Sequence, residues 1–403
     1  MSILSWISVI LWTKRTAYIL PIQEERKVKD MERHPYRPGL SGIVASETEI
    51  SQIQEALTYR GYPIEELARE ALFIEVAYLL LHGELPSHEQ LADFQTLLVE
   101  TGQLPQPVIS VIDSIPPHIE MMEVIRTGIS LLAHFDPQME YGMFMSEFAN
   151  AQYLLAMLPQ LISYRYHQVN GSKAVRPNFH HSYAGSFWYM LKGDEPSQLE
   201  EEAFNAALIT YADYGLAPST FAARVVASTG SPLYSAICSA VGSINGQLHC
   251  SSGTGVLDAM QEALYSGNVE DWVCQEITKG KRVLGFESSH HKPKDPRSAV
   301  LKEYCSQLAN ALGLTEMETA ADTIEEMMAK VQGVHPRVEW HTSRLLHYLG
   351  FEPELFTPIF TVSRLVGWIA HVIEQSENNH LYQPSSRYVG MDTRKYKPLP
   401  LRS

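Results

Sequence analysis

Residues 233–246 read LYSAICSAVGSING. Apolar side chains recur in this stretch at steps of three and four residues, which places them on one face of a helix. They are Leu233, Ala236, Ile237, Ala240, Val241 and Ile244. Asn245 and Gly246 follow and are typical of a helix C-terminus. The pattern predicts an amphipathic core helix over 233–244.

The same helical spacing recurs in both directions from this stretch. It is found over 256–264 and again after Asp295-Pro296, where Leu301, Tyr304, Cys305, Leu308 and Leu312 would form a buried face. A nearly continuous apolar run follows over 359–373. Few segments alternate with the period of two that strands show. We therefore expect an all-α fold, in a chain long enough for two domains.

Composition excludes several function classes. The 403 residues carry a formal net charge of −15, whereas binding to nucleic-acid phosphates needs a basic surface. The four cysteines form no CxxC pair and no close cluster with histidine, so neither a metal site nor a disulfide framework is expected. We expect a cytoplasmic protein with no nucleic-acid or membrane partner.

The first thirty residues differ from the rest. A short apolar run, 3–12, precedes Lys14 and Arg15. Ten apolar residues are too few to cross a bilayer, and a signal peptide has its positive charges before the apolar run. We interpret 1–30 as a disordered or mis-started extension, with Met31 as the natural start.

His249 is the first candidate for chemistry. It lies between the helices predicted over 233–244 and 256–264. A histidine near a helix N-terminus can donate to a developing oxyanion, and a surface loop histidine is the alternative. Local sequence leaves both open.

Residues 285–297 form the second candidate and combine turn formers with His290, His291, Lys292 and Lys294. Arg297 is expected in the first turn of a helix, where the helix dipole disfavours a cation. This placement suggests an anionic partner, although an arginine that points into water is common. The two lysines suit phosphate groups, although surface lysines usually have no specific partner.

Glu339 and Arg364 complete the candidates. Glu339 follows Pro336 near the start of a helix, where it is either a capping residue or a partly buried general base. Arg364 is the single charge within the apolar run 359–373. A cation there needs an acidic partner or an anionic ligand.

Five longer motifs identify a family. They are GLSGIVA (39–45), YRGYPIEEL (59–67), EVAYLLLHGELP (75–86), STFAARVVAST (219–229) and GWIAH (367–371). With these motifs the chain resembles bacterial citrate and 2-methylcitrate synthases over residues 40–390.

The resemblance implies an all-α homodimer whose large and small helical domains close over the substrates. We place the large domain at 31–250 and 351–403 and the small domain at 251–350. The implied reaction deprotonates an acyl-CoA (acetyl- or propionyl-CoA) to an enol, adds it to a 2-oxo acid and hydrolyses the thioester. Coenzyme A is then part of a substrate, whose phosphates Lys292 and Lys294 are expected to contact, and no bound cofactor or metal is implied.

Part of the family's catalytic set is retained. His249 matches the histidine that holds the acyl-CoA carbonyl during enolisation. Glu339 stands where the family has its aspartate base, one methylene longer. Arg297 and Arg364 match two arginines that bind the carboxylates of the oxo acid.

The groups that act on the oxo acid are altered. Tyr214 stands in place of a substrate-binding histidine, and Ser288 in place of the histidine that protonates the oxo-acid carbonyl. Gln383 replaces the arginine that reaches across the dimer to a substrate carboxylate. His290 and His291, or the hydroxyl of Tyr214, are candidates for the missing donor.

Three interpretations follow from this mixture. In the first, the protein is an acyl-CoA-condensing enzyme with an altered electrophile, for example one with fewer carboxylates than oxaloacetate. Alternatively, it is a catalytically inactive paralogue that acts as a dimeric CoA-binding or regulatory protein. The third possibility is an ordinary citrate or 2-methylcitrate synthase that tolerates the changes.

We predict that residues 1–30 are dispensable for folding. The second half of this segment is charged and lacks helical periodicity, so it has no apolar face to bury. A chain that begins at Met31 should show the circular dichroism and unfolding midpoint of the full chain. Failure of the shortened chain to fold would contradict the interpretation.

Overall fold

The computed structural model describes residues 36–40, 42–53, 56–137, 147–178, 180–246, 248–249, 253–286 and 295–402. The chain divides into two compact units, of which Glu47–Gln383 contains the helices and the sheet. The other unit, Met1–Ser46 with Pro384–Ser403, contains the 3₁₀ turns η3 (Pro38–Leu40) and η6 (Leu399–Leu401). The predicted extension over 1–30 lies outside the described residues.

The all-α fold class is confirmed. In the first half of the chain the helices are α2 (Ile64–Glu70), α3 (Phe73–His82), α4 (His88–Glu100), α5 (Gln106–Ser114), α6 (Met121–Leu132), α7 (Glu147–Val169), α8 (Tyr183–Lys192) and α9 (Gln198–Tyr211). In the second half they are α10 (Pro218–Ser228), α11 (Leu233–Ile244), α12 (Gly253–Tyr265), α13 (Val269–Thr278), α14 (Arg297–Leu312), α15 (Thr315–Gln332), α16 (Val338–Tyr348), η5 (Pro353–Leu355) and α17 (Phe356–Glu377).

A small antiparallel sheet that the sequence did not reveal accompanies the helices. Its strands, in the order β1-β2-β3, are Ser51–Ile53, Leu57–Tyr59 and Tyr62–Pro63. Ser51 pairs with Tyr59 across β1 and β2. Strands of two or three residues are too short to show a period-two pattern, which explains why the pattern was missed.

Local signals set many of the helix ends. Ser87 and Ser197 form capping boxes with Gln90 and Glu200, so each serine accepts from a backbone N–H that the first turn leaves unpaired. At the other end, glycines adopt the left-handed conformation that stops a helix. They are Gly83 after α3, Gly193 after α8, Gly313 after α14 and Gly333 after α15.

The helices predicted around residues 233–244, 256–264 and 297–312 are present. The predicted buried face over 297–312 needs one correction, because Leu312 is 53% exposed. It is the last residue of α14, and Gly313 turns the chain away before Leu312 can pack. Helix α14 begins at Arg297, and Pro296 is its N-cap residue.

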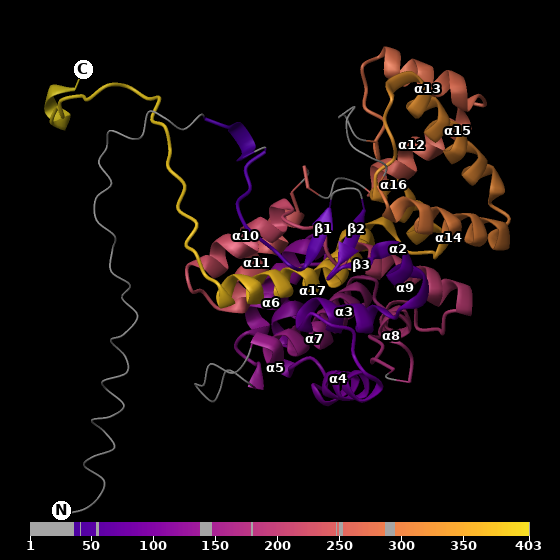
Figure 1. Ribbon diagram of the computed structural model, residues 1–403, viewed down its shortest axis with the longest axis horizontal. Coiled ribbons are helices and arrows are strands. Elements are labelled where there is room, and N and C mark those ends of the chain that lie inside the picture. Colours follow the sequence, from indigo (N-terminus) through magenta and orange to yellow (C-terminus); the bar gives the residue numbers. More distant parts are fainter. Residues whose placement is uncertain are drawn as a thin grey trace, which may run out of the picture. The chain divides into compact units, whose positions relative to one another are not determined.

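Helix α17 is the centre of the core. It packs against α3, α6, α7, α9, α10 and α11, and Figure 1 shows it in yellow across the middle of the helical unit. By length and composition, Pro353–Glu377 could cross a membrane, but 94% of its most apolar window is buried inside the protein. That is the burial expected of a core helix.

Helices α12 to α16 pack on one another and form a group of their own in Figure 1. These are the helices of the predicted small domain. Because α14 and α16 also pack against α9, they belong to the same compact unit as the other helices. The division at residues 250 and 351 stays a prediction.

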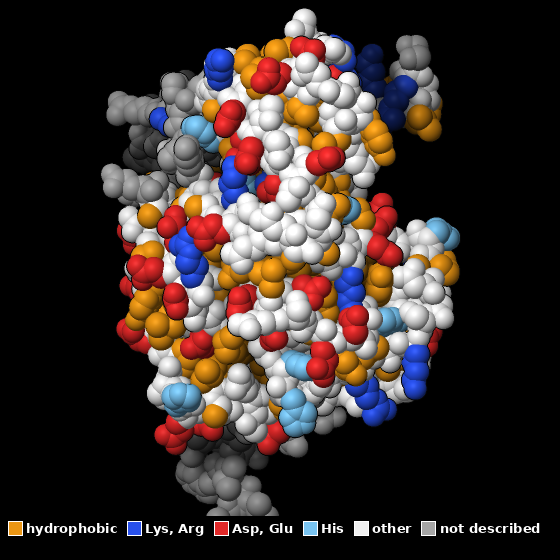
Figure 2. Space-filling view, turned by 90° about the vertical axis from the view of Figure 1, so that its right-hand side faces the viewer, with side chains coloured by type: hydrophobic (Ala, Val, Ile, Leu, Met, Phe, Trp, Pro, Cys, Tyr) orange, Lys and Arg blue, Asp and Glu red, His pale blue; other side chains and the backbone are white. Residues whose placement is uncertain are grey.

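The surface is consistent with the acidic composition. On the face shown in Figure 2, Asp and Glu side chains are spread over the described surface, with Lys and Arg between them in small groups.

Gly367 of α17 permits a close approach of this helix to the end of α9. A Cβ at this position would overlap the carbonyl oxygen of Ala212 and lie 2.6 Å from Oδ1 of Asp213. We predict that Gly367→Ala lowers the free energy of unfolding by about 1–3 kcal/mol or more, because neither atom can move away without breaking buried contacts. Urea unfolding at a fixed protein concentration measures the change.

Glu377→Ala is the control for this prediction. Glu377 is the exposed last residue of the same helix, so its replacement should change the free energy of unfolding by less than about 0.5 kcal/mol. Equal effects of the two substitutions would contradict the packing argument.

Candidate active site

His249 is held by Ser219, at the start of α10. The Nε2 atom of His249 accepts from the backbone N–H of Ser219 at 3.0 Å and from its hydroxyl at 2.8 Å. The indole N–H of Trp368 donates to the same hydroxyl oxygen at 3.1 Å. An Nε2 atom that accepts carries no proton, so neutral His249 has its proton on Nδ1, which is left as a donor.

The surroundings of His249 favour this neutral form. Burial lowers the pKa of His249, and the positive charges of Arg364 and Arg337 lower it further, while its own backbone hydrogen bond and the charge of Glu339 act in the opposite direction. The net effect is a pKa below the usual value of a histidine. A neutral donor near a cluster of arginines can stabilise a developing oxyanion without giving up its proton.

Arg297 lies in the first turn of α14, as predicted, and is 4% exposed. Its Nε and Nη2 atoms donate to the two carboxylate oxygens of Asp295 at 2.9 and 2.7 Å. The carboxylate also accepts from the backbone N–H of Arg297 at 3.1 Å. The guanidinium lies over the ring of Tyr214, 4.1 Å from its centre.

The Arg297–Asp295 pair is strongly ionised. Burial alone would raise the pKa of Asp295, but the charge and hydrogen bonds of Arg297 outweigh it and hold this pKa below its usual value. Burial would likewise lower the pKa of Arg297, and Asp295 more than reverses the effect. The place of Arg297 in the first turn of a helix suggested an anionic partner. That partner is Asp295 of the same chain.

Arg364 projects from the buried middle of α17 and is 5% exposed. Its Nε atom donates to the carbonyl oxygen of Tyr211 at 2.6 Å, which fixes the guanidinium against the end of α9. Among the described residues, no carboxylate lies within ion-pair distance of Arg364. The sequence left two possibilities for Arg364, an acidic partner or an anionic ligand. Within the described residues, the structure contains no direct salt bridge to it.

Asp213 lies behind the site and is fully buried. Its Oδ2 atom accepts from the Ser51 hydroxyl at 2.5 Å and from the backbone N–H of Gly215 at 2.8 Å, and His371 lies 3.3 Å from Oδ1. Burial alone would raise the pKa of Asp213, but His371 and the charge of Arg364 hold it below its usual value. An ionised Asp213 therefore anchors the loop that carries Tyr214.

Glu339 lies in the first turn of α16 with its side chain 18% exposed. The Oε2 atom is buried and accepts no hydrogen bond from the described residues. It lies 3.4 Å from Nε of Arg337, the N-cap residue of the same helix. A carboxylate oxygen that accepts no hydrogen bond keeps its lone pairs available to take a proton.

These side chains meet in one pocket of about 210 Å³. Five residues singled out from the sequence line it, namely Tyr214, His249, Arg297, Glu339 and Arg364. The other lining residues are Tyr211, Ala217, Pro218, Ile244, Leu248, Arg337 and Phe360. The pocket thus joins the ends of α9 and α11 with the starts of α10, α14 and α16 and the middle of α17.

The remaining predicted residues are not part of this pocket. Gln383 is exposed, beyond the end of α17, and does not line the pocket within the single chain. Ser288, His290, His291, Lys292 and Lys294 lie outside the described residues. Their predicted roles stay predictions.

Sequence reasoning missed four residues that shape the site: Ser219, Asp295, Arg337 and Phe360. Asp295 was used only to mark where the helical pattern after it begins, although an aspartate two residues before a buried arginine can also pair with it. Ser219 and Phe360 offered no local signal, since each reaches the pocket through tertiary packing.

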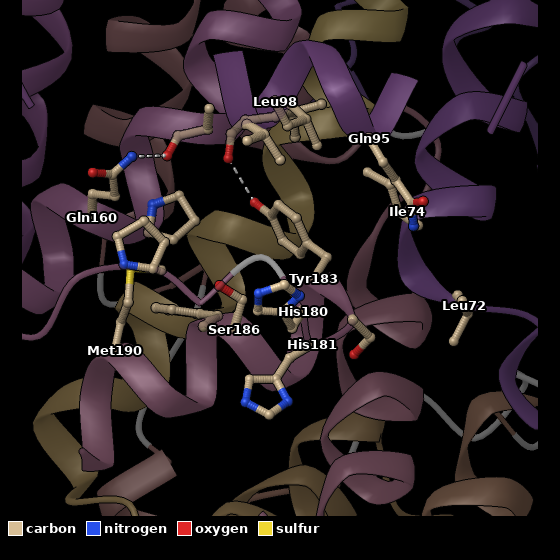
Figure 3. A pocket seen from close by; sticks show the side chains of 17 residues that line it. Leu72, Ile74, Gln95, Leu98, Gln160, His180, His181, Tyr183, Ser186 and Met190 are labelled. Carbon is tan, nitrogen blue, oxygen red and sulfur yellow. Dashed lines mark hydrogen bonds between the residues drawn. The ribbon is translucent and has the colours of Figure 1, made fainter. Parts of the chain in front are cut away.

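A second cavity of about 330 Å³ lies between α4, α7 and α8. Its polar groups are partly used within the protein, because Gln160 donates to the carbonyl of Ala156 and Tyr183 to that of Leu155 (Figure 3). Its described lining contains no Arg, Lys, Asp or Glu side chain. It therefore suits a charged substrate less well than the pocket around His249.

Comparison with known proteins shows the family of the chain. A sequence profile described as citrate synthase, C-terminal domain, matches residues 39–385. The chain belongs to the citrate synthase family. It is 35% identical over 367 residues to citrate synthase 2 of Bacillus subtilis, covering 91% of this chain and 99% of that protein. It is 34% identical to the 2-methylcitrate synthase of Shewanella oneidensis, covering 90% and 97%.

Solved citrate synthase structures share the fold. The enzyme of Pyrobaculum aerophilum matches with a TM-score of 0.80 and 30% identity, covering 90% of this chain and 95% of that chain. The citrate synthase of Thermoplasma acidophilum, solved as a ternary complex with carboxymethyl coenzyme A and oxaloacetate, matches with a TM-score of 0.80 and 26% identity, covering 90% of this chain and 98% of that chain.

We predict that His249 stays neutral below the pH at which free histidine is half protonated. Its pKa is lowered in the folded state, whereas the unfolded value is about 6.5. The stability contributed by neutral His249 is therefore present above about pH 6.5 and decreases as the pH falls from there toward the folded-state pKa. Nitrogen NMR of labelled histidine should show Nδ1 protonated and Nε2 unprotonated in this window.

His249→Gln assigns the signal, and the same histidine in urea-unfolded protein should titrate near 6.5. A folded-state signal that titrates at or above the unfolded value, or one with the proton on Nε2, would overturn the tautomer derived from Ser219.

Proposed function

We propose that the protein condenses an acyl-CoA, acetyl- or propionyl-CoA, with a 2-oxo acid and hydrolyses the thioester of the product. The observation that carries the proposal is that His249 and Glu339 line the same pocket. His249 offers an Nδ1–H donor, and Glu339 offers a buried carboxylate oxygen that accepts no hydrogen bond from the described residues. These two groups are what enolisation of a thioester requires.

The first step is a proton transfer from carbon. The α-carbon of the acyl group loses a proton to the Glu339 carboxylate, and the electron pair of the C–H bond moves into the enolate. The His249 Nδ1–H stabilises the oxygen that gains the charge. Glutamate is longer than aspartate, and a displacement of about 1 Å in a base lowers the rate unless the surrounding groups correct it.

Addition to the 2-oxo acid is where this chain departs from its relatives. An acid beside the oxo-acid carbonyl contributes about 10²–10⁴-fold to the rate, and Ser288 replaces the family's acid. Tyr214 and Gln383 replace two groups that hold the substrate. The loss of one charge-assisted hydrogen bond costs about 1.5–3 kcal/mol. We therefore expect weak activity with oxaloacetate.

A non-catalytic role is the second candidate. Arg297 is already paired with Asp295, and Glu339 with Arg337, as expected of a site whose charges have come to serve stability. In that case the protein would act as a dimeric CoA-binding or regulatory protein. A homodimer is part of both proposals.

We predict that enolisation is retained while citrate formation is weak. The test follows deuterium loss from labelled acetyl-CoA, with oxaloacetate or a non-reactive analogue present, and citrate in the same sample. Deuterium loss without comparable citrate supports the proposal. Glu339→Gln should reduce deuterium loss by about 10²-fold or more, because it removes the base and keeps the shape.

Other outcomes separate the alternatives. Citrate formation as fast as deuterium loss would favour an ordinary citrate synthase. No deuterium loss with either acyl-CoA would favour the non-catalytic role. The triple replacement Ser288→His, Tyr214→His and Gln383→Arg should increase citrate formation if only the oxo-acid side is impaired.

A further inference from the structure

The backbone N–H of Ser219 is one that a helix start normally leaves unpaired. Ser219 is the second residue of α10, and the N-cap residue, Ala217, has no side chain that could accept from the first turn. The Nε2 atom of His249 accepts from this N–H at 3.0 Å. The imidazole therefore takes the place of an N-cap side chain, which ties its ring to the start of α10.

The hydroxyl of Ser219 bonds to side chains from other parts of the chain. A serine within a helix can instead donate back to a carbonyl of its own helix, as Ser228 of α10 does to the carbonyl of Val225 at 2.7 Å. Ser219 is fully buried, and its Oγ atom lies 2.8 Å from Nε2 of His249. A contact from outside α10 must therefore hold this hydroxyl in its direction.

Trp368 of α17 supplies that contact. Its indole N–H donates to Oγ of Ser219 at 3.1 Å, and an indole nitrogen can only donate. The single hydroxyl hydrogen of Ser219 is therefore directed away from Trp368, and Nε2 of His249 is the acceptor within reach. Because Trp368 and Ser219 are both fully buried, bulk water does not compete for these bonds.

Donation from Trp368 also strengthens the next bond in the series. A hydroxyl that accepts a hydrogen bond becomes a better donor, because each bond in a chain polarises the next. Stronger donation from Ser219 to Nε2 favours the imidazole whose proton is on Nδ1. That form of His249 is the one that can donate to a thioester oxygen.

We infer that Trp368 is a positioning residue of the active site. Its indole N–H orients the Ser219 hydroxyl toward Nε2 of His249 and thereby keeps the proton of His249 on Nδ1, as the donor to the enolate oxygen. Trp368 is not among the residues that line the pocket, so it acts through Ser219. This role deepens the proposed acyl-CoA condensation and rests on it.

The charged groups around His249 act separately from this contact. They are Arg364 of α17 and Arg337 and Glu339 of α16, and Arg297 of α14 lines the same pocket. None of the four is replaced in the variants below, so their influence on His249 is the same throughout.

The first test uses the unaltered full chain and needs no substrate. A protonated imidazole carries hydrogen on both nitrogens, so the Ser219 hydroxyl must turn away from Nε2 when His249 takes up a proton. The NMR signal of the Trp368 indole N–H should then shift with the same midpoint as His249. The indole signal of Trp188, whose buried N–H has no hydrogen-bond partner among the described residues, should not shift with it. A Trp368 signal that stays constant while His249 titrates would overturn the inference.

The second test removes the indole N–H. Trp368→Phe should raise the pKa of His249 and slow deuterium loss from acetyl-CoA about three- to tenfold, the effect of one neutral hydrogen bond. The KM for acetyl-CoA should change less than about twofold, because the contact acts on the donor to the enolate and not on binding of the thioester. Trp188→Phe removes the same atoms at another buried site and should change neither quantity.

A double-mutant cycle separates this role from core packing. Ser219→Ala keeps the backbone N–H and removes the hydroxyl through which Trp368 acts. In this background Trp368→Phe should have no further effect on the pKa of His249 or on deuterium loss. Equal effects of Trp368→Phe with and without the Ser219 hydroxyl would mean that the indole acts through packing alone, and the positioning role would be wrong.

The failures of the two proposals are distinguishable, because the NMR titrations require no reaction. Deuterium loss that Trp368→Phe leaves unchanged would overturn the role of Trp368 and leave the condensation proposal standing. Absence of deuterium loss in the unaltered protein would overturn the condensation proposal, whereas a shared titration of Trp368 and His249 would still support the contact through Ser219. If Trp368→Phe does not fold, or acid unfolds the protein before His249 titrates, the other of the two measurements decides the question.

Discussion

The close approach of α17 to the end of α9 is the constraint on which the site depends. It is possible only because residue 367 has no side chain, so that the backbone of α17 can lie against the carbonyl of Ala212 and the carboxylate of Asp213. One turn earlier on the same helix, Arg364 reaches the carbonyl of Tyr211. The buried position of the Arg364 guanidinium in the pocket thus follows from the packing of two helices.

Asp213 extends this constraint into a buried polar network. Arg224 donates to Nδ1 of His371 at 2.7 Å and to Glu374 at 2.6 Å, which leaves the other ring nitrogen of His371 to face Asp213. The network joins α10, α17 and the loop after α9, so the charge on Asp213 is compensated without exposure to water. Leaving part of a buried network unpaired is costly. The network therefore holds the loop that carries Tyr214 in one position.

A second network positions the base. Glu325 of α15 accepts from the indole N–H of Trp340 at 2.8 Å and from Lys302 at 2.7 Å, and Arg344 is paired with Glu318 at 2.9 Å. These contacts fix α16 against α14 and α15. Glu339 precedes Trp340, so the first turn of α16 holds its carboxylate at the pocket and leaves only side-chain rotation free.

The sequence by itself determined the helical class, the core helices α11 and α17, and five residues of the pocket. These features depend on periodicity, on turn residues and on whole motifs, all of which are local in the chain. Only the tertiary structure decided how the charges pair. From local sequence, Arg297 could face either an anionic partner or solvent, and the structure shows that it pairs with Asp295. Arg364 could have either an acidic partner or an anionic ligand until its surroundings were known. Sequence spacing records which charges a chain has, whereas their compensation depends on distances between side chains that only folding sets.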